Sequence, residues 1–342
     1  MSKFSPQTSF KTGIQDRAAG AVMGAYIGDA LGLGPHWYYD LDEQRAQYGD
    51  WIDGYTAPLP GRYHAGLKAG QQSQAGHILN MLIDSLITKG DYDEADFCRR
   101  LDNDLFPHLD GTPNSGPGGF TSQSIREAWA GRVEQKKPWG EVAGFADNTE
   151  AAERVLALAV RYAGNPAKIA DTVLSNTKLT QCDETINSMT ATYGAVLGML
   201  IEGHPLDAHL SDKLLELVDG DKLPCQERTY YETPSNIARA ADEGLIEPAW
   251  KVSTVYGMSC AVSYLFPASY YLATRYKGDF ENAVLHAING GGQNMARAML
   301  TGALVGAQVG LGGIPDRFIQ GLENSDELLA RAEGLASSMK SE

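Results

Sequence analysis

The 342-residue sequence has little cysteine and no long apolar run. Its four cysteines, Cys98, Cys182, Cys225 and Cys260, are scattered, with no pair at the spacing of a zinc clip or a redox motif. We therefore expect neither a disulfide framework nor a structural zinc site, and we expect a reducing, cytoplasmic setting. No apolar run approaches the roughly 20 residues of a membrane span, and the first residues lack the apolar core of a signal peptide, so a soluble protein is predicted.

Basic residues are also few. The chain has 28 Lys and Arg against 43 Asp and Glu, a formal net charge of −15. In the absence of a basic cluster, this charge repels nucleic-acid phosphates and anionic lipids. We expect a small-molecule ligand as the partner, with no nucleic acid and no membrane. The oligomeric state is left open.

Apolar residues recur at helical spacing almost throughout, and alternating strand-like stretches are scarce. The pattern predicts an all-α protein, a compact multi-helix bundle forming a single domain over residues 1–342 with its core at approximately 15–320. Two long aperiodic segments, 40–74 and 103–121, are either functional loops or surface excursions. Helices are predicted at 14–32, 75–88, 93–103, 122–131, 149–163, 166–175, 183–202, 211–218, 252–275, 280–288, 294–310 and 325–339.

Glycine recurs every four residues at positions 20 to 32 and again at 302 to 310. A glycine inside a helix costs roughly 0.5–1 kcal/mol relative to alanine, so the repetition needs a gain elsewhere. A stripe without side chains allows two helix axes to approach closely. We therefore predict that helices 14–32 and 294–310 pack against each other in a central bundle.

The stretch "AINGGGQNMAR" at 287–297 runs three glycines into a helix. Gly291 and Gly292 can adopt positive φ and bring N–H groups close to a ligand at the positive end of the helix dipole. Gln293 and Asn294 add amide groups, and Arg297 can bind a carboxylate or phosphate. This pattern predicts an anion-binding site, although a tight turn followed by an exposed arginine remains an alternative.

The second candidate cluster is "GDALGLGPHWYYD" at 28–40. Asp29 ends an apolar helix, where a carboxylate is expensive to bury without a partner. His36 and Asp40 follow, and with Asp29 they are the candidate catalytic residues. Trp37 and Tyr39 can stack on a base or a sugar. The alternative is that Asp29 caps a neighbouring element and the aromatic residues fill the core.

The third cluster, "GQQSQAGH" at 70–77, gathers neutral polar residues at a helix entrance. Gln72, Ser73, Gln74 and His77 are the candidate ligand-binding residues, with a plain N-cap as the alternative for Ser73. Neutral amides do not readily hold a divalent cation, because magnesium requires carboxylates or phosphates around it.

Taken together, these stretches resemble the ADP-ribosylglycohydrolase superfamily over approximately residues 15–320. "GDALG" stands at 28–32, "GALVGAQVG" at 302–310 and "GGIP" at 312–315. The resemblance implies an all-α fold of the ADP-ribosylglycohydrolase type. In that family a "TDDT" and a "GGDTDT" motif supply aspartates to a dinuclear magnesium centre.

The chain departs from this pattern at the metal ligands. The resemblance places residues 73–76, "SQAG", where the family has "TDDT", and places Gln293 and Met295 at the two late aspartates. The glutamate that follows "GDALG" in the family falls at His36. The resemblance therefore implies that the magnesium ligands are lost, so we expect no metal and no cofactor. "PHWYYD" at 35–40 and "GMSCAVSYLFPA" at 257–268 resemble a branch that includes J-class crystallins of jellyfish and selenoprotein J.

Two functional hypotheses follow. The first is a metal-independent glycosidic hydrolase, or a related lyase or transferase, acting on an N-glycoside or another small polar ligand that could carry phosphate. Asp29, His36 and Asp40 would supply acid–base chemistry while the 293–297 segment orients the ligand. The second is a non-catalytic ligand-binding protein or a crystallin-like structural protein. The density of polar residues favours the enzyme.

Overall fold

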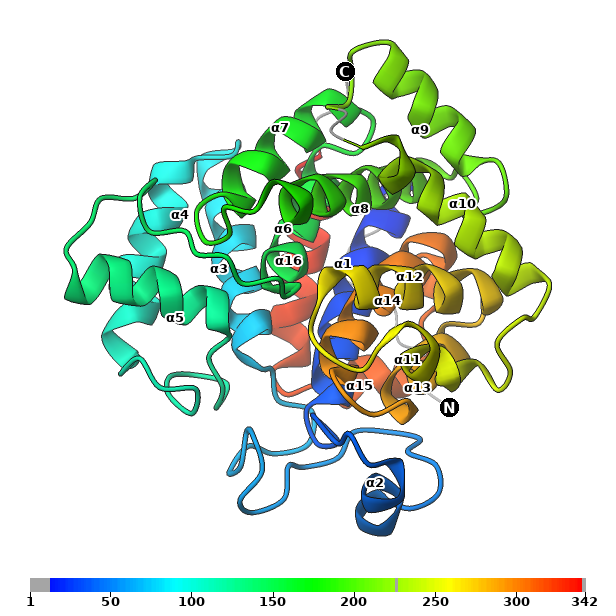
Figure 1. Ribbon diagram of the computed structural model, residues 1–342, viewed down its shortest axis with the longest axis horizontal. Helices are drawn as coiled ribbons and strands as arrows, with labels where there is room; N and C mark the ends of the chain where they lie inside the picture. Colours follow the sequence, from blue (N-terminus) through cyan, green and yellow to red (C-terminus); the bar gives the residue numbers. More distant parts are fainter. Residues whose placement is uncertain (1–12, 225–226, 340–342) are drawn as a thin grey trace.

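The computed structural model describes residues 13–224 and 227–339, and these ranges consist of helices joined by loops, with two isolated bridges and no strand (Figure 1). The predicted all-α fold is confirmed. No described helix is long and apolar enough to cross a membrane. The helices are α1 (Gly13–Gly32), α2 (Leu41–Tyr48), α3 (Gln74–Lys89), α4 (Glu94–Arg100), α5 (Gln123–Trp129), α6 (Glu150–Arg161), α7 (Pro166–Thr177), α8 (Glu184–Glu202), α9 (Leu210–Asp219), α10 (Arg228–Asp242), α11 (Val252–Tyr256), α12 (Val262–Arg275), α13 (Phe280–Asn289), α14 (Asn294–Val309), α15 (Asp316–Gln320) and α16 (Ser325–Ser337).

Five of these helices differ from the prediction. The helix predicted at 252–275 is two helices, because the chain turns at Gly257, whose φ is 137°. Helix α2 lies inside the segment predicted as a loop at 40–74, and its polar sequence shows no apolar periodicity. Helices α10 and α15 were not predicted: α10 carries Pro234 in its interior, a helix-breaking signal, and α15 is only one turn long.

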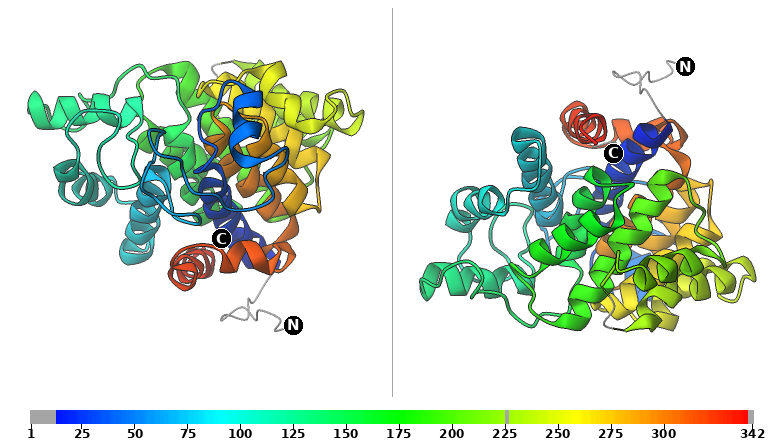
Figure 2. Two further views of the ribbon diagram at one scale, coloured as in Figure 1. Left: turned by 90° about the horizontal axis from the view of Figure 1, so that it is seen from below. Right: turned by 90° about the horizontal axis from the view of Figure 1, so that it is seen from above.

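The predicted pairing of the two glycine-striped helices is confirmed. Helices α1 and α14 cross in the middle of the molecule with their backbones in contact (Figures 1 and 2). A Cβ atom added at Gly24 would lie 2.0 Å from the carbonyl oxygen of Gly302, and one added at Gly20 would lie 2.4 Å from that of Gly306. Glycine is therefore required where the axes are closest, and the buried contact outweighs its low helix propensity.

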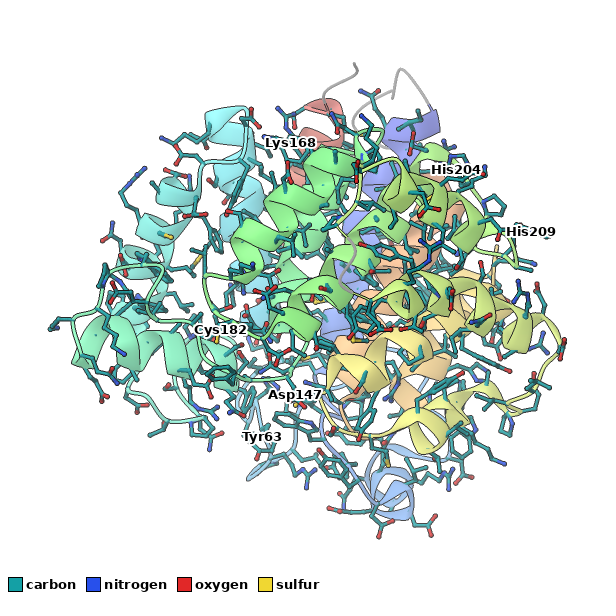
Figure 3. The ribbon with its side chains drawn as sticks, turned by 45° about the horizontal axis from the view of Figure 1, so that its top comes forward. Tyr63, Asp147, Lys168, Cys182, His204 and His209 are labelled. Atoms are coloured by element: carbon teal, nitrogen blue, oxygen red, sulfur yellow. The ribbon has the colours of Figure 1, made fainter. Side chains whose placement is uncertain are left out.

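The other helices surround this pair, and their side chains fill the space between the ribbons (Figure 3). Helices α12, α13 and α8 cover α14, while α16, α3 and α6 lie against α1 or its neighbours. The loop 33–73, which contains α2, extends from the end of α1 at the lower edge of Figure 1. The segment that follows α1 and the first residues of α3, α5, α6 and α14 meet around one cavity.

Candidate functional site

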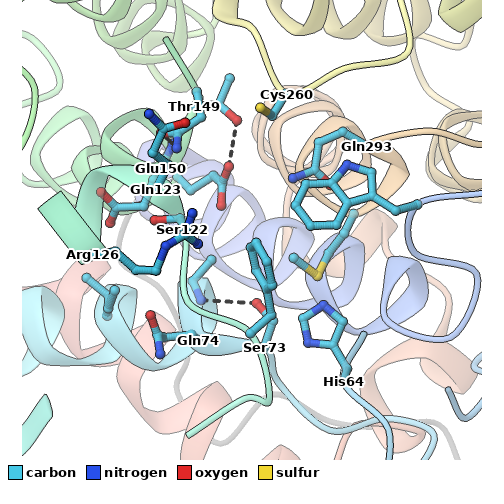
Figure 4. A pocket seen from close by; sticks show the side chains of 17 residues that line it. His64, Ser73, Gln74, Ser122, Gln123, Arg126, Thr149, Glu150, Cys260 and Gln293 are labelled. Atoms are coloured by element: carbon cyan, nitrogen blue, oxygen red, sulfur yellow. Dashed lines mark hydrogen bonds between the residues drawn. The ribbon is translucent and has the colours of Figure 1, made fainter. Parts of the chain in front are cut away.

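A buried cavity of about 150 Å³ lies where these helices begin (Figure 4). The N-terminal ends of four helices border it, so the positive ends of their dipoles favour an anionic group there. The residues around it are Trp37, His64, Ser73, Gln74, Ala75, Ile78, Phe120, Ser122, Gln123, Arg126, Asn148, Thr149, Glu150, Glu153, Cys260, Gln293 and Met295.

Ser73 and Gln74 border the cavity as predicted, and each is held by hydrogen bonds. The Ser73 hydroxyl donates to Asp29 Oδ1 at 2.5 Å and accepts from the Ala75 N–H at 3.0 Å, so it is also the N-cap of α3. The Gln74 amide donates to Thr121 Oγ1 at 3.0 Å. Both side chains are therefore fixed before any ligand binds.

Asp29 was predicted to be catalytic, but it lies behind Ser73 and is not part of the cavity wall. It is fully buried, and its second oxygen accepts the Ser73 N–H at 2.8 Å. Burial raises the pKa of Asp29 to about 6, although the hydrogen bonds from Ser73 oppose the shift. These contacts favour the alternative in which Asp29 supports a neighbouring element, because its two oxygens hold Ser73, the N-cap of α3.

His36 was also predicted to be catalytic, and it too lies outside the wall. Its Nδ1 is 2.6 Å from Nε2 of His64, and its Nε2 contacts the side-chain amide of Gln293. Nδ1 of His64 in turn lies 2.5 Å from the Gly118 carbonyl oxygen. Burial lowers the pKa of His36 well below its usual value and that of His64 to about 4, so both rings are neutral.

Because both rings are neutral, the direction of each hydrogen bond from Gly118 through His64 and His36 to Gln293 is fixed. The carbonyl of Gly118 only accepts, so His64 carries its proton on Nδ1 and accepts from His36 at Nε2. His36 Nε2 then holds a lone pair and requires a donor. The Gln293 side chain must direct its NH₂ group toward His36, which corresponds to a half turn of the amide from the orientation with Oε1 at this contact. His36 thus orients Gln293 in the wall.

Trp37 separates the cavity from a second, outer cavity of about 560 Å³. Its φ is 61°, and its ring stacks on His36 at 4.3 Å and packs edge-on against Phe120 at 4.7 Å. Tyr39 is exposed and borders only the outer cavity. Among the described residues, no group accepts a hydrogen bond from the buried Trp37 Nε1.

Asp40 was predicted to be catalytic, and this prediction is wrong. Its carboxylate is exposed and caps α2, accepting the N–H groups of Asp42 at 2.9 Å and Glu43 at 3.3 Å. An Asp directly before a helix is a strong N-cap signal. It was overlooked because α2 itself was not predicted.

The structure does not place the glycine loop as an anion site on the cavity wall. Gly291 and Gly292 do have positive φ, 64° and 59°, but the N–H groups of Gly292 and Gln293 donate within the protein. Gly292 N–H donates to the Tyr38 carbonyl at 2.7 Å, and Gln293 N–H donates to that of Met258 at 2.8 Å. The loop therefore joins the α1 exit to the segment before α12 and leaves these donors unavailable to a ligand.

Arg297 and Asn294 belong to the same structural unit. Arg297 is fully buried and donates through Nε to Ala287 O at 2.9 Å and through Nη2 to Gly291 O at 2.6 Å. Asn294 is buried and donates to the carbonyl of Ile288 at 3.3 Å. Both side chains hold the loop in place, and neither borders the cavity.

Gln72 and His77 face away from the main cavity. Gln72 donates to the Tyr26 carbonyl at 3.2 Å, and both residues border a surface groove near Arg331. His77 is the fourth residue of α3 and borders the surface grooves, whereas Gln74 borders the cavity. Proximity in the sequence misled the prediction here, because neighbouring residues of one segment border different cavities.

Sequence analysis missed two acidic residues of α6 that border the cavity, Glu150 and Glu153, and Figure 4 shows Glu150 on the other side of the cavity from Gln293. Glu153 is buried and accepts the Thr149 hydroxyl at 2.6 Å. Burial raises the pKa of Glu153 to about 8, and the Thr149 hydrogen bond opposes the shift. Glu150 is 5% exposed and pairs with the buried Arg154 at 2.5 Å through Oε2. The available signal was the occurrence of two glutamates and an arginine in an otherwise apolar helix, "EAAERVLALAV".

Known proteins with similar sequences and structures identify the family of this chain. The family model for ADP-ribosylglycohydrolase matches residues 11–342. The chain belongs to the ADP-ribosylglycohydrolase family. It is 26% identical over 313 residues to the ADP-ribosyl-[dinitrogen reductase] glycohydrolase of Rhodospirillum rubrum, covering 91% of each chain. A solved structure titled ADP-ribosylglycohydrolase-related protein complex shares the fold, with a TM-score of 0.63, 20% identity and coverage of 96% of this chain and 99% of the other.

The residues at the family's metal positions do not fit a magnesium pair. The four residues that the resemblance matches to metal ligands, Ser73, Gln74, Gln293 and Met295, all border the cavity. Their donors are a hydroxyl, two amides and a thioether, and none of these offsets the charge of Mg²⁺. Within residues 13–224 and 227–339, no cluster of three or more His, Cys, Asp or Glu side chains is arranged to hold a metal.

Proposed function

We propose that this ADP-ribosylglycohydrolase family member is a metal-independent hydrolase that cleaves an N-glycoside of a small polar ligand in the cavity. The central observation is that the positions matching the family's metal ligands still form the cavity wall but carry neutral groups, several held by hydrogen bonds. The printed name of the Rhodospirillum rubrum relative describes a glycohydrolase that acts on an ADP-ribosylated protein. A ribosyl compound is therefore the first substrate class to examine.

Arg126 supports a ligand with an anionic group, such as a phosphate. Its side chain borders the cavity, and its Nη1 donates to the Thr121 carbonyl at 2.5 Å. It makes no ion pair with another described side chain. In a chain with a net charge of −15, an unpaired guanidinium beside four helix N-termini attracts anions. Arg126 thus takes the role that the sequence assigned to Arg297.

The test is turnover by the full chain in EDTA. NAD, ADP-ribosyl-arginine and N-ribosyl bases are incubated with the protein in EDTA and, in parallel, in magnesium, and the released base or amine is measured by chromatography. We expect cleavage of at least one compound at the same rate in both buffers. Cleavage only in magnesium would contradict metal independence. Binding of these compounds without cleavage would instead support the non-catalytic alternative.

A further inference from the structure

Glu150 and Glu153 form a pair of carboxyl groups on one face of α6, toward the cavity. They are three residues apart, so they lie one above the other on that face. The sequence interpretation gave neither residue a role, and neither occupies a position matched to a metal ligand of the family. Each is about 95% buried, which is unusual for glutamate outside a functional site.

The two carboxyl groups differ in their surroundings. Glu150 pairs through Oε2 with Arg154, whose buried guanidinium also bonds Asn176 and Thr180, so Glu150 faces a fixed cation. Glu153 receives only the Thr149 hydroxyl, a neutral donor. Two acids with opposite surroundings in one site are the arrangement that glycoside-cleaving enzymes use to hold one group protonated and the other ionised.

Glu150 also has an unused oxygen. Its Oε1 is buried and has no hydrogen-bond partner within the described parts of the chain. A buried carboxylate oxygen without a partner carries a desolvation cost that a ligand donor or a positive charge would relieve. Because Glu150 borders the cavity, a bound ligand is the natural source of that partner.

We propose that Glu153 is the general acid and base of the N-glycoside cleavage and that Glu150 stabilises the positive charge that develops on the sugar. This inference rests on the proposed function. Protonated Glu153 donates its proton to the leaving nitrogen as the C1–N bond breaks and its electron pair passes to nitrogen. Water then forms the C1–O bond, and the Glu153 carboxylate accepts the water proton and returns to its starting state.

Other charged and titratable groups surround Glu153, and their effects must be separated from its own. The Thr149 hydroxyl donates to Glu153, and Cys260 and Arg126 border the same cavity. The groups facing Glu153 are Glu150 and Arg154 from α6, Asp29 from α1, Tyr193 from α8, Cys260 before α12 and Arg126 from α5. Burial raises its pKa to about 8, which leaves it protonated at neutral pH, as the general-acid role requires.

The first experiment reads the protonation state without a ligand. Infrared difference spectra between the wild type and Glu153→Gln should show a carboxylic-acid band at pH 7 that disappears as the pH rises through about 8. In Thr149→Val the band should persist to higher pH, because the hydroxyl that favours the carboxylate is gone. A band absent at pH 7 in the wild type would overturn the general-acid role.

The second experiment separates the two carboxyl groups. The cation 1,4-dideoxy-1,4-iminoribitol mimics the charged sugar, and its affinity is measured by calorimetry. We expect at least about tenfold weaker binding in Glu150→Gln. On whichever glycoside the wild type cleaves, Glu153→Gln should lose at least about 100-fold in kcat with little change in KM. Glu216→Gln, an exposed glutamate on α9, is the control and should match the wild type in both assays.

The outcomes distinguish the two proposals. Cleavage by the wild type with kcat retained within about threefold in Glu153→Gln would overturn the role of Glu153 and leave the proposed function standing. Equal iminoribitol affinity in the wild type and Glu150→Gln would overturn the role of Glu150. No cleavage of any glycoside by the wild type would contradict the proposed function itself, and with it the catalytic role of both residues.

Discussion

Burial decides the protonation state of the side chains around the cavity. His64 is neutral because burial lowers its pKa to about 4, and Glu153 is protonated because burial raises its pKa to about 8. Removal from water therefore sets the role of these two side chains at the cavity: a neutral ring and a carboxyl group that can donate a proton.

The effect of Glu153 on stability has a definite sign. Its carboxyl titrates near 4.5 in the unfolded chain and near 8 in the fold. Its contribution to stability is therefore fully present below about pH 4.5 and is lost as the pH rises through about 8. Glu153→Gln removes this loss, so at pH 7 the variant should be more stable by roughly 3 kcal/mol. Urea unfolding at several pH values from 5 to 8 measures the free energy of unfolding of both proteins. The same pH dependence of this free energy in the variant and the wild type would contradict the prediction.

Replacing Arg297 should destabilise the protein, in contrast to replacing Glu153. Because its guanidinium is fully buried and bonds the carbonyls of Ala287 and Gly291, Arg297→Ala should lower the free energy of unfolding by about 3 kcal/mol. Arg99→Ala is the control, since that side chain is 56% exposed and its removal should change stability by less than about 1 kcal/mol. Chemical denaturation measures both. An Arg297→Ala protein as stable as the wild type would restore the ligand-binding interpretation.

Residue roles were only partly predictable from the sequence. Ser73, Gln74, Trp37 and Gln293 were predicted at the site and do border the cavity, since polar or aromatic residues at the ends of well-formed helices indicate where those ends meet. The direction of the N–H groups in the glycine loop could not be predicted, because it depends on Tyr38 and Met258 from distant segments. Whether any of these residues contacts a ligand stays a prediction.

At the scale of elements, glycine spacing was the strongest signal. A four-residue repeat on two helices predicted their contact across more than 270 residues of sequence, and the contact is confirmed. Helices α2 and α10 carry no comparable pattern. One is short and polar, and the other contains Pro234, so local sequence opposes what tertiary packing imposes.

The glycine pairing can be tested with a single methyl group. In Gly24→Ala the added Cβ would lie 2.0 Å from the Gly302 carbonyl oxygen, so α1 and α14 must separate. We expect a loss of about 2 kcal/mol or more despite the better helix propensity of alanine. Gly334→Ala in α16 is the matched control, because its Cβ would meet only the end of the exposed Ile87 side chain at 3.2 Å. Thermal unfolding should show a lower Tm for Gly24→Ala and an unchanged or higher Tm for Gly334→Ala; equal Tm values would contradict the packing argument.

At the scale of the whole molecule, the fold gathers four helix N-termini and one unpaired arginine around a single buried cavity. The net charge of −15 would repel an anionic ligand elsewhere on the chain, so this local field directs such a ligand inward. The predicted fold of the family is confirmed, whereas the loss of the metal ligands stays a prediction. The two are separate, because the motifs for helix packing and those for metal binding are different sets of residues.

Ligand binding in this cavity without magnesium is tested most directly by titration calorimetry of the full chain with ADP-ribose and with ribose 5-phosphate in EDTA. We expect binding of at least one of them, unchanged when EDTA is replaced by magnesium, and about tenfold weaker in Arg126→Ala because the guanidinium contacts the phosphate. Binding that appears only in magnesium would show that the neutral wall holds a metal after all and would contradict the proposed chemistry.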